Sequence, residues 1–242
     1  MVDSVALVAA DSVAAAQAVA GKKEKTILMK NLAQKFLTQE EQDALVQCVK
    51  DVEKRTSGEI VPVIASTSYD YRRAGLIGGL VFGVVAAVCT ATLFEQTEMW
   101  AFLVQFLGFF LVFSRLLNAF PAMKKLFISK REMQEEVNEA AFTAFYQYGL
   151  HHTRDLTGII IYVSVFERSV QVLADKGIND KVDPTVWKEV IETVTNGIRA
   201  GRSGEALCQG VTRCGELVTK NFPIKADDTD ELPNLIIEGD AH

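Results

Sequence analysis

The chain has 242 residues, of which 23% are charged and 49% hydrophobic, and its formal net charge is −6. This length accommodates one α/β domain plus a membrane segment, but not two full soluble domains. The acidic balance excludes a general nucleic-acid binder, because such binding neutralises phosphates with Lys and Arg.

Residues 1–28 form an Ala-rich stretch that superficially resembles a signal peptide. Asp3 and Asp11 interrupt its apolar run, and no Lys or Arg precedes it, so we expect a disordered tail instead. Alternatively, Met29 is the true start, since organised sequence begins only after it.

A helix and a strand are predicted next. Thr38 and Glu41 match a capping box that opens an amphipathic helix over about 39–55. Residues 59–65, EIVPVIA, are typical of a strand. Pro62 has no N–H to donate, which indicates an edge position or a strand end.

Two apolar segments then predict a transmembrane hairpin over 74–120. Residues 74–94 carry no charge and are long enough to cross a bilayer. After the acidic turn Glu95–Glu98, residues 99–117 form a second span in which only Arg115, near the end, is charged; a residue of this kind can snorkel to the interface.

The charges around the spans predict their orientation. Lys and Arg flank the outer ends of both spans, and the connecting turn has none. By the positive-inside rule, both chain ends are then cytoplasmic. The cations in question are Arg72, Arg73, Arg115, Lys124, Lys125, Lys130 and Arg131; those after the hairpin could also bind anionic headgroups.

Gly75, Gly79 and Gly83 recur at spacing four and give the first span a face without side chains. This face can receive the second span of the same chain, near Gly108, or a second copy of the protein in a homo-oligomer. Gln105 is interpreted as a hydrogen-bonding residue between the helices.

After the hairpin we predict a helix over about 133–148 that ends at Gly149, followed by two strands. GIIIYVSV, residues 158–165, has the continuous apolar character of a central strand, and SVQVLAD, residues 169–175, alternates like an antiparallel partner. If the turn is centred on residues 167–168, the numbers of two residues that face each other on the paired strands sum to 335. Ile160 then faces Asp175, and Asp155 faces Asp180.

Asp183 and Pro184 predict the N-cap and first residue of the next helix. A last helix is expected over about 203–221, with Cys214 as a small core residue, and residues 223–242 form an acidic tail that is extended on the domain or mobile. The four cysteines, Cys48, Cys89, Cys208 and Cys214, show no CxxC spacing, so neither a zinc knuckle nor a disulfide framework is predicted, and a reducing compartment fits.

These segments together resemble the TPM domain family. The residues that carry the resemblance are FLTQEEQDALVQCVKDVEKRTSGEIVPVIA, GLHHTRDLTGIIIYVSVFERSVQVLADKGI, NFP and DELPN. The resemblance implies an α/β domain, split here into residues 29–73 and 121–222, and the inserted hairpin is similar to that of a bacterial inner-membrane subgroup. Some TPM proteins are described as weak phosphatases or divalent-cation binders, and others assemble, repair or modulate membrane complexes.

Asp155, Asp180 and Asp183 form the candidate metal site, because the expected strand pairing brings them to one end of the sheet. Carboxylate oxygens suit Ca²⁺ or Mg²⁺. Alternatively, Asp183 only caps its helix and Asp155 pairs with Arg154 or Lys181; Asp175 is a fourth candidate.

No nucleophile beside a base and no phosphate-binding motif is evident in the sequence, and the neighbours His151 and His152 are poorly spaced for one metal. The first hypothesis is therefore a non-enzymatic, membrane-anchored adaptor with a membrane-protein partner. The alternative is a divalent-cation-dependent phosphatase.

Overall fold

The computed structural model describes residues 32–95, 98–224 and 231–238. The predicted tail over 1–28 and the alternative start at Met29 lie outside the described residues. The chain divides into two compact units, one of residues up to 68 and from 136 onward, and one of residues 69–135. Each unit is considered by itself.

The first unit is built on a four-stranded mixed sheet. Its strands are β1 (Glu59–Ala65), β2 (Gly158–Ser164), β3 (Ser169–Ala174) and β4 (Ile236–Ile237), in the order β3-β2-β1-β4. β1 pairs in parallel with both β2 and β4, and β3 pairs antiparallel to β2. The predictions of a mixed α/β fold and of a central strand at GIIIYVSV are confirmed.

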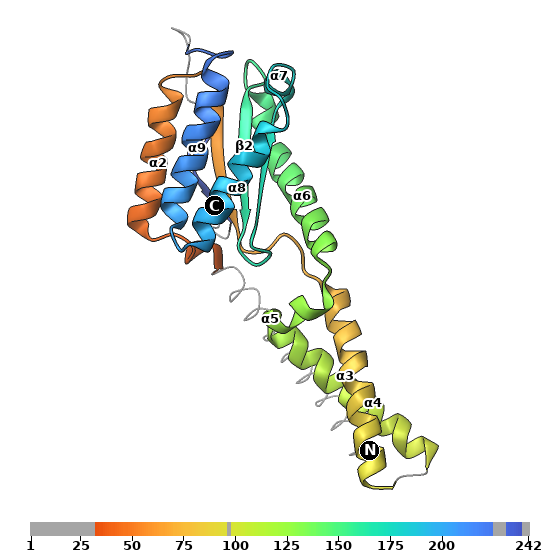
Figure 1. The fold of residues 1–242 in the computed structure, drawn as a ribbon. Coiled ribbons are helices and arrows are strands. Elements are labelled where there is room, and N and C mark those ends of the chain that lie inside the picture. Colours follow the sequence, from red (N-terminus) through yellow and green to blue (C-terminus); the bar gives the residue numbers. More distant parts are fainter. Residues whose placement is uncertain (1–31, 96–97, 225–230, 239–242) are drawn as a thin grey trace, which may run out of the picture. The chain divides into compact units, whose positions relative to one another are not determined.

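Helices cover both faces of this sheet (Figure 1). α2 (Gln39–Glu53), α8 (Val186–Arg199) and α9 (Ser203–Thr219) pack on one face, and α6 (Lys130–Gln147) packs on the other. The predicted capping box opens α2, where Thr38 Oγ1 accepts the N–H of Glu41 and Glu41 Oε2 accepts that of Thr38. Gly149 ends the α6 region with a φ of 76°.

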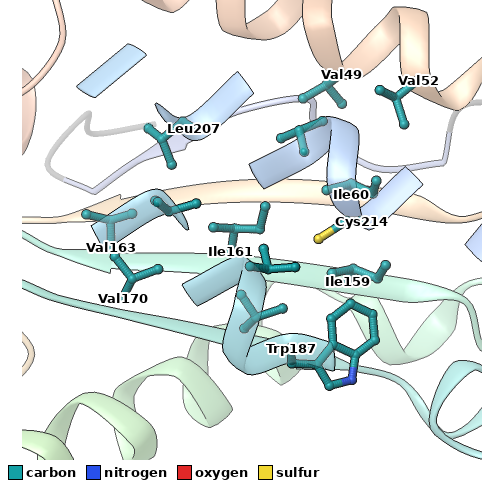
Figure 2. Close-up of a cluster of buried hydrophobic side chains, with 14 of the residues drawn as sticks. Val49, Val52, Ile60, Ile159, Ile161, Val163, Val170, Trp187, Leu207 and Cys214 are labelled. Carbon is teal, nitrogen blue, oxygen red and sulfur yellow. The ribbon is translucent and has the colours of Figure 1, made fainter. Parts of the chain in front are cut away.

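The larger hydrophobic core lies between the sheet and the helices α2, α8 and α9. Figure 2 shows Ile159 and Ile161 of β2 near Cys214 of α9, Val163 farther along β2 near Val170, and Val49 of α2 above them. All of these side chains are buried. Since apolar burial contributes about 25 cal/mol per Å², this interface is the main stabilising element of the unit.

The register of β2 with β3 differs from the predicted one by two residues. Ile160 faces Leu173 rather than Asp175, and partner numbers sum to 333 because the last pair is Ser164 with Ser169. The connecting turn is longer than predicted, since Val165 leaves β2 and donates its N–H to Ala65 O. The strand pairing therefore does not place Asp155 opposite Asp180.

α8 also begins later than predicted. Its N-cap is Thr185 rather than Asp183, whose carboxylate accepts the N–H and the Oγ1–H of Thr185, each at 2.8 Å. Asp183 thus stabilises the turn before the helix.

Pro62 occupies a position in β1 that needs no donor. Ile60 donates its N–H to Glu53 Oε1 and Ile64 accepts from Glu238, so the even-numbered residues of β1 face away from β2. β4 pairs only with Val63 and Ile64. The missing N–H of Pro62 therefore faces the part of β1 that β4 does not cover, but the predicted edge or strand-end position is wrong, because β1 lies between β2 and β4 and Pro62 lies in its middle.

β4 adds the residues around Ile236 to the sheet, so this part of the acidic tail lies extended on the domain. Glu238 follows β4, donates its N–H to Ile64 O at 2.8 Å and hydrogen bonds to Tyr148 through its carboxyl group. Burial raises the pKa of the Glu238 carboxyl, and the hydrogen bond from Tyr148 offsets part of this rise.

The second unit contains two long apolar helices, α3 (Arg72–Leu93) and α4 (Met99–Ala119), followed by α5 (Pro121–Lys124) and the short 3-10 helix η1 (Lys125–Phe127). Both long helices have the length and composition of candidate membrane spans. Most of their large apolar side chains are exposed, including Leu76 at 54% and Trp100 at 73%.

The glycine face of α3 lies against α4 of the same chain. A Cβ on Gly75 would meet Asn118 at 2.8 Å, and one on Gly83 would meet the backbone N of Phe110 at 3.0 Å. Between them Gly79 faces Ser114, whereas a Cβ on Gly108 would meet nothing within 4 Å. Self-association through these glycines, which stays a prediction, would require α4 to move away from them.

Gln105 of α4 donates a hydrogen bond to Thr90 Oγ1 of α3. The predicted role of Gln105 between the helices is confirmed.

The Glu53 to Ile60 hydrogen bond gives a test of the β1 geometry. Glu53→Ala leaves the fully buried Ile60 N–H without its acceptor, so we expect a loss of about 1–3 kcal/mol in unfolding free energy. Urea unfolding followed by Trp fluorescence measures the loss. The control Glu53→Gln keeps an acceptor oxygen, and equal destabilisation by both variants would contradict this assignment.

Glu238 gives a pH-dependent test of the β4 attachment. Because its folded-state pKa is raised, its contribution to stability is present below the unfolded pKa of about 4.3 and is lost as pH rises through the folded value. Relative to Glu238→Gln, the wild-type unfolding temperature should therefore fall from acidic to neutral pH. A pH-independent difference between the two proteins would refute this effect.

Candidate functional site

The three predicted metal ligands occupy different local settings. Asp155 lies in the loop before β2, Asp180 is exposed at the end of α7 (Lys176–Asn179), and Asp183 is exposed before α8. The two hydrogen bonds from Thr185 lower the pKa of the Asp183 carboxyl. No group of three His, Cys, Asp or Glu residues that could hold a metal ion is found among the described positions, so a Ca²⁺ or Mg²⁺ site at Asp155, Asp180 and Asp183 stays a prediction.

The fourth candidate, Asp175, is the N-cap of α7. Its Oδ1 accepts the N–H of Lys176 at 2.6 Å, and its Oδ2 is buried and has no hydrogen-bond partner among the residues that the structure describes. This unpartnered oxygen lines a groove described below.

His151 and His152 belong to a 3-10 helix, η2 (Leu150–His152). Their ring centroids lie 3.8 Å apart, and the His151 ring lies 4.9 Å from that of Tyr146. The two imidazoles therefore extend a row of aromatic rings from α6.

The cysteines also differ from expectation. Cys48 of α2 and Cys208 of α9 form a disulfide, which the sequence spacing did not predict because the partners are 160 residues apart. Cys214 is fully buried, which confirms it as a core residue, and burial raises the pKa of its thiol to about 12.

The carboxyl ends of parallel strands are the usual ligand sites of α/β proteins. At the ends of β1 and β2 the carboxylate of Glu167 accepts the Thr67 hydroxyl and the Ser68 N–H, each at 3.1 Å, and the Ser164 hydroxyl. Glu167 is buried. Its oxygens are engaged in joining the two strand ends, which indicates a structural role.

A groove of about 460 Å³ follows the edge strand β3 between α6 and α8. Phe142 and Tyr146 of α6 line it and are 55% and 58% exposed. Trp187 of α8 also lines it and is 7% exposed, and no residue in the described part of the chain accepts a hydrogen bond from its indole Nε1. The remaining lining residues are Phe145, Val172, Leu173, Ala174, Asp175, Lys176 and Asn179.

We call this the β3-edge groove. Sequence reasoning missed it, although Phe142 and Tyr146 stand at spacing four on the predicted helix and outside its apolar stripe. Two large aromatic residues on the solvent side of a helix were the available signal.

A second groove of about 660 Å³ lies over α2, α8 and α9. Arg213 crosses it and pairs with Glu189 at 3.4 Å and Glu216 at 3.0 Å. Because ion pairs at an exposed surface contribute little free energy, this groove offers weaker anchoring than the aromatic one.

Comparison with known proteins identifies the domain. Residues 126–217 match the family model described as TPM domain. No curated protein matches the chain. Among solved structures, the chain is similar to the NMR structure of the BA42 protein from the psychrophilic bacterium Bizionia argentinensis, with 25% sequence identity and a TM-score of 0.52 over 84% of this chain and 94% of that one.

The match extends from the end of the second unit to α9, and the similarity to the BA42 protein covers most of the chain. The family model thus places a TPM domain over residues 126–217, and the chain as a whole is similar in fold to the BA42 protein.

Proposed function

We propose that the protein is a membrane-anchored adaptor whose TPM domain binds other membrane proteins. The observation that carries this proposal is the β3-edge groove, where Phe142 and Tyr146 are more than half exposed. Exposed aromatic residues of this kind are typical of protein-binding surfaces.

The anchor is the hairpin of α3 and α4. Both helices are long and apolar enough to span a bilayer, and their exposed apolar side chains would then face lipid. The packing of Gly79 on Ser114 and the Gln105 to Thr90 hydrogen bond would hold them together within it.

The orientation that we propose is cytoplasmic for both chain ends, in a bacterial inner membrane. Cations lie at the outer ends of both helices and are absent from the residues 95–98 between them. Lys124 contributes its charge to this topology but is not placed to bind a lipid headgroup. It is only 3% exposed, and its Nζ lies 3.7 Å from the carboxylate of Asp70.

The Cys48 to Cys208 disulfide argues against this orientation, because disulfides persist mainly in oxidising compartments and the cytoplasm is reducing. We follow the charges, since seven flanking cations on one side set orientation directly. In a reducing cytoplasm the same two cysteines would be held as neighbouring thiols.

Cysteine accessibility tests the orientation. In a background without native cysteines, Glu98→Cys should react with an impermeant maleimide in intact cells, because the turn lies outside. Asp180→Cys, at an exposed position of the domain, should react only after lysis. Labelling of Asp180→Cys in intact cells would show that the domain lies outside the cytoplasm and would contradict the proposed orientation.

Partner capture tests the adaptor function. A membrane protein co-purified with the wild-type chain at native expression should be lost, by at least about tenfold, from a Phe142→Ser/Tyr146→Ser variant. It should be retained by Arg213→Ser, which alters the other groove. Equal recovery from all three proteins would contradict binding through the β3-edge groove.

The second candidate, a divalent-cation-dependent phosphatase, is supported by the family resemblance alone. It would use Asp155, Asp180 and Asp183 as ligands of the cation. Phosphate release by purified protein that requires Mg²⁺ and disappears in Asp155→Asn and Asp180→Asn would favour this candidate over the adaptor.

A further inference from the structure

The free edge of β3 presents backbone hydrogen-bonding groups to the β3-edge groove. Asp175 donates its N–H to Gly158 O at 2.9 Å, so Asp175 and Gly158 form a hydrogen-bonded pair of the antiparallel ladder. This pair determines which residues of β3 bond to β2 and which face the free edge. Hydrogen-bonded and non-hydrogen-bonded pairs alternate, so Leu173 and Gln171 bond to β2, and Val172 and Ala174 direct their N–H and C=O groups outward. Asn179 Nδ2 donates to Ala174 O at 2.6 Å, which confirms this phase.

Val172 is therefore the residue through which a new strand can pair. Its N–H and C=O lie on the free edge, and it is among the residues that line the groove, although it is only 4% exposed, so a pairing strand must displace the side chains around it. A peptide residue opposite Val172 can exchange two hydrogen bonds with it, as neighbouring strands do in an antiparallel pair.

Two side-chain atoms in the same groove also lack partners. Trp187 is more than nine-tenths buried, yet no described group accepts its indole N–H. In Figure 2 the indole nitrogen of Trp187 points away from Ile159 and the other aliphatic side chains of the core. Asp175 Oδ2 is likewise buried without a donor.

These groups differ in what they require. The Trp187 N–H requires an acceptor such as a peptide carbonyl, and the Asp175 carboxylate requires a donor, best supplied by a cation. The exposed ring of Tyr146 can contribute further, because a Lys or Arg cation is attracted to the face of an aromatic ring.

We propose that the β3-edge groove binds an extended peptide segment that carries a Lys or Arg residue. The segment pairs with Val172 as an added strand, gives a carbonyl to Trp187, and places its cation between Asp175 and the aromatic residues of α6. This inference deepens the adaptor function by naming the chemistry of its partner.

The probe is an acetylated and amidated heptapeptide, TVTKTVT, added to the full ¹⁵N-labelled chain in detergent micelles. The chain has two Trp residues, Trp100 and Trp187, so two indole N–H signals report separately. We expect the Trp187 signal to move downfield with millimolar peptide, because its N–H gains an acceptor, while the Trp100 signal stays in place.

Three further ligands test the chemistry. An analogue with Glu in place of the central Lys, and one with N-methyl groups on alternate amides, should each bind at least about tenfold more weakly. N-acetyl-lysine amide, which has the cation without the strand, should leave the Trp187 signal unshifted.

Protein variants complete the test, with affinity measured by anisotropy of the fluorescein-labelled peptide. Asp175→Asn keeps the helix-capping oxygen but removes the charge, and should weaken binding by at least about tenfold; Trp187→Phe should weaken it several-fold. The matched control Asp183→Asn, a second Asp that accepts backbone N–H groups outside the groove, should bind like wild type.

The proposal is overturned if the Trp187 signal does not move, if the Lys and Glu peptides bind equally, or if Asp175→Asn behaves like Asp183→Asn. A shift with N-acetyl-lysine amide alone would also overturn it, because the ligand would then be a small ammonium compound. Partner capture that still depends on Phe142 and Tyr146 after such a failure would leave the adaptor function standing, so the two outcomes are distinguishable.

Discussion

The parallel pairing of β1 with β2 is the constraint on which the rest of the structure depends. β1 precedes the hairpin and β2 follows it, and the two strands pair along their full length from Glu59 with Gly158 to Ala65 with Ser164. A chain that crosses a bilayer between these strands must return to the same side before the sheet can form. An even number of spans meets this requirement, and the two candidate spans α3 and α4 would supply it.

The pairing also organises both layers of the domain. Ile60 and Ile159 contribute to the core under α2, α8 and α9, whereas Val61 and Ile160 contribute to the core under α6. At the strand ends Glu167 joins the loops after β1 and β2 through hydrogen bonds to Thr67, Ser68 and Ser164. The polar groups at the carboxyl ends of β1 and β2 thus hold the two halves of the chain together. The proposed partner-binding site is therefore placed at the edge of β3.

Local patterns were sufficient to predict most elements. The capping box at Thr38, the left-handed Gly149 and the buried Cys214 depend on residues close in sequence or on one helical face, so the sequence displays them directly. Features set by distant residues were not accessible in this way. The Cys48 to Cys208 disulfide joins two helices across the hairpin, and the β2 to β3 register depends on where Val165 leaves the sheet. The Asp155, Asp180 and Asp183 constellation relied on that register, and the β3-edge groove exists only where α6, α7 and α8 meet one strand.

Hydrogen exchange on the full chain in detergent measures the central pairing most directly. Odd-numbered residues of β1 face β2, as the bond from Glu59 N–H to Thr157 O shows, so the amides of Val61 and Val63 should be protected as strongly as those of Ile159 and Ile161 in β2. Both pairs should exchange only through unfolding of the whole domain. Rapid exchange of Val61 and Val63 beside a protected β2 would show that β1 is not in the sheet, and would contradict a domain assembled from both sides of the hairpin.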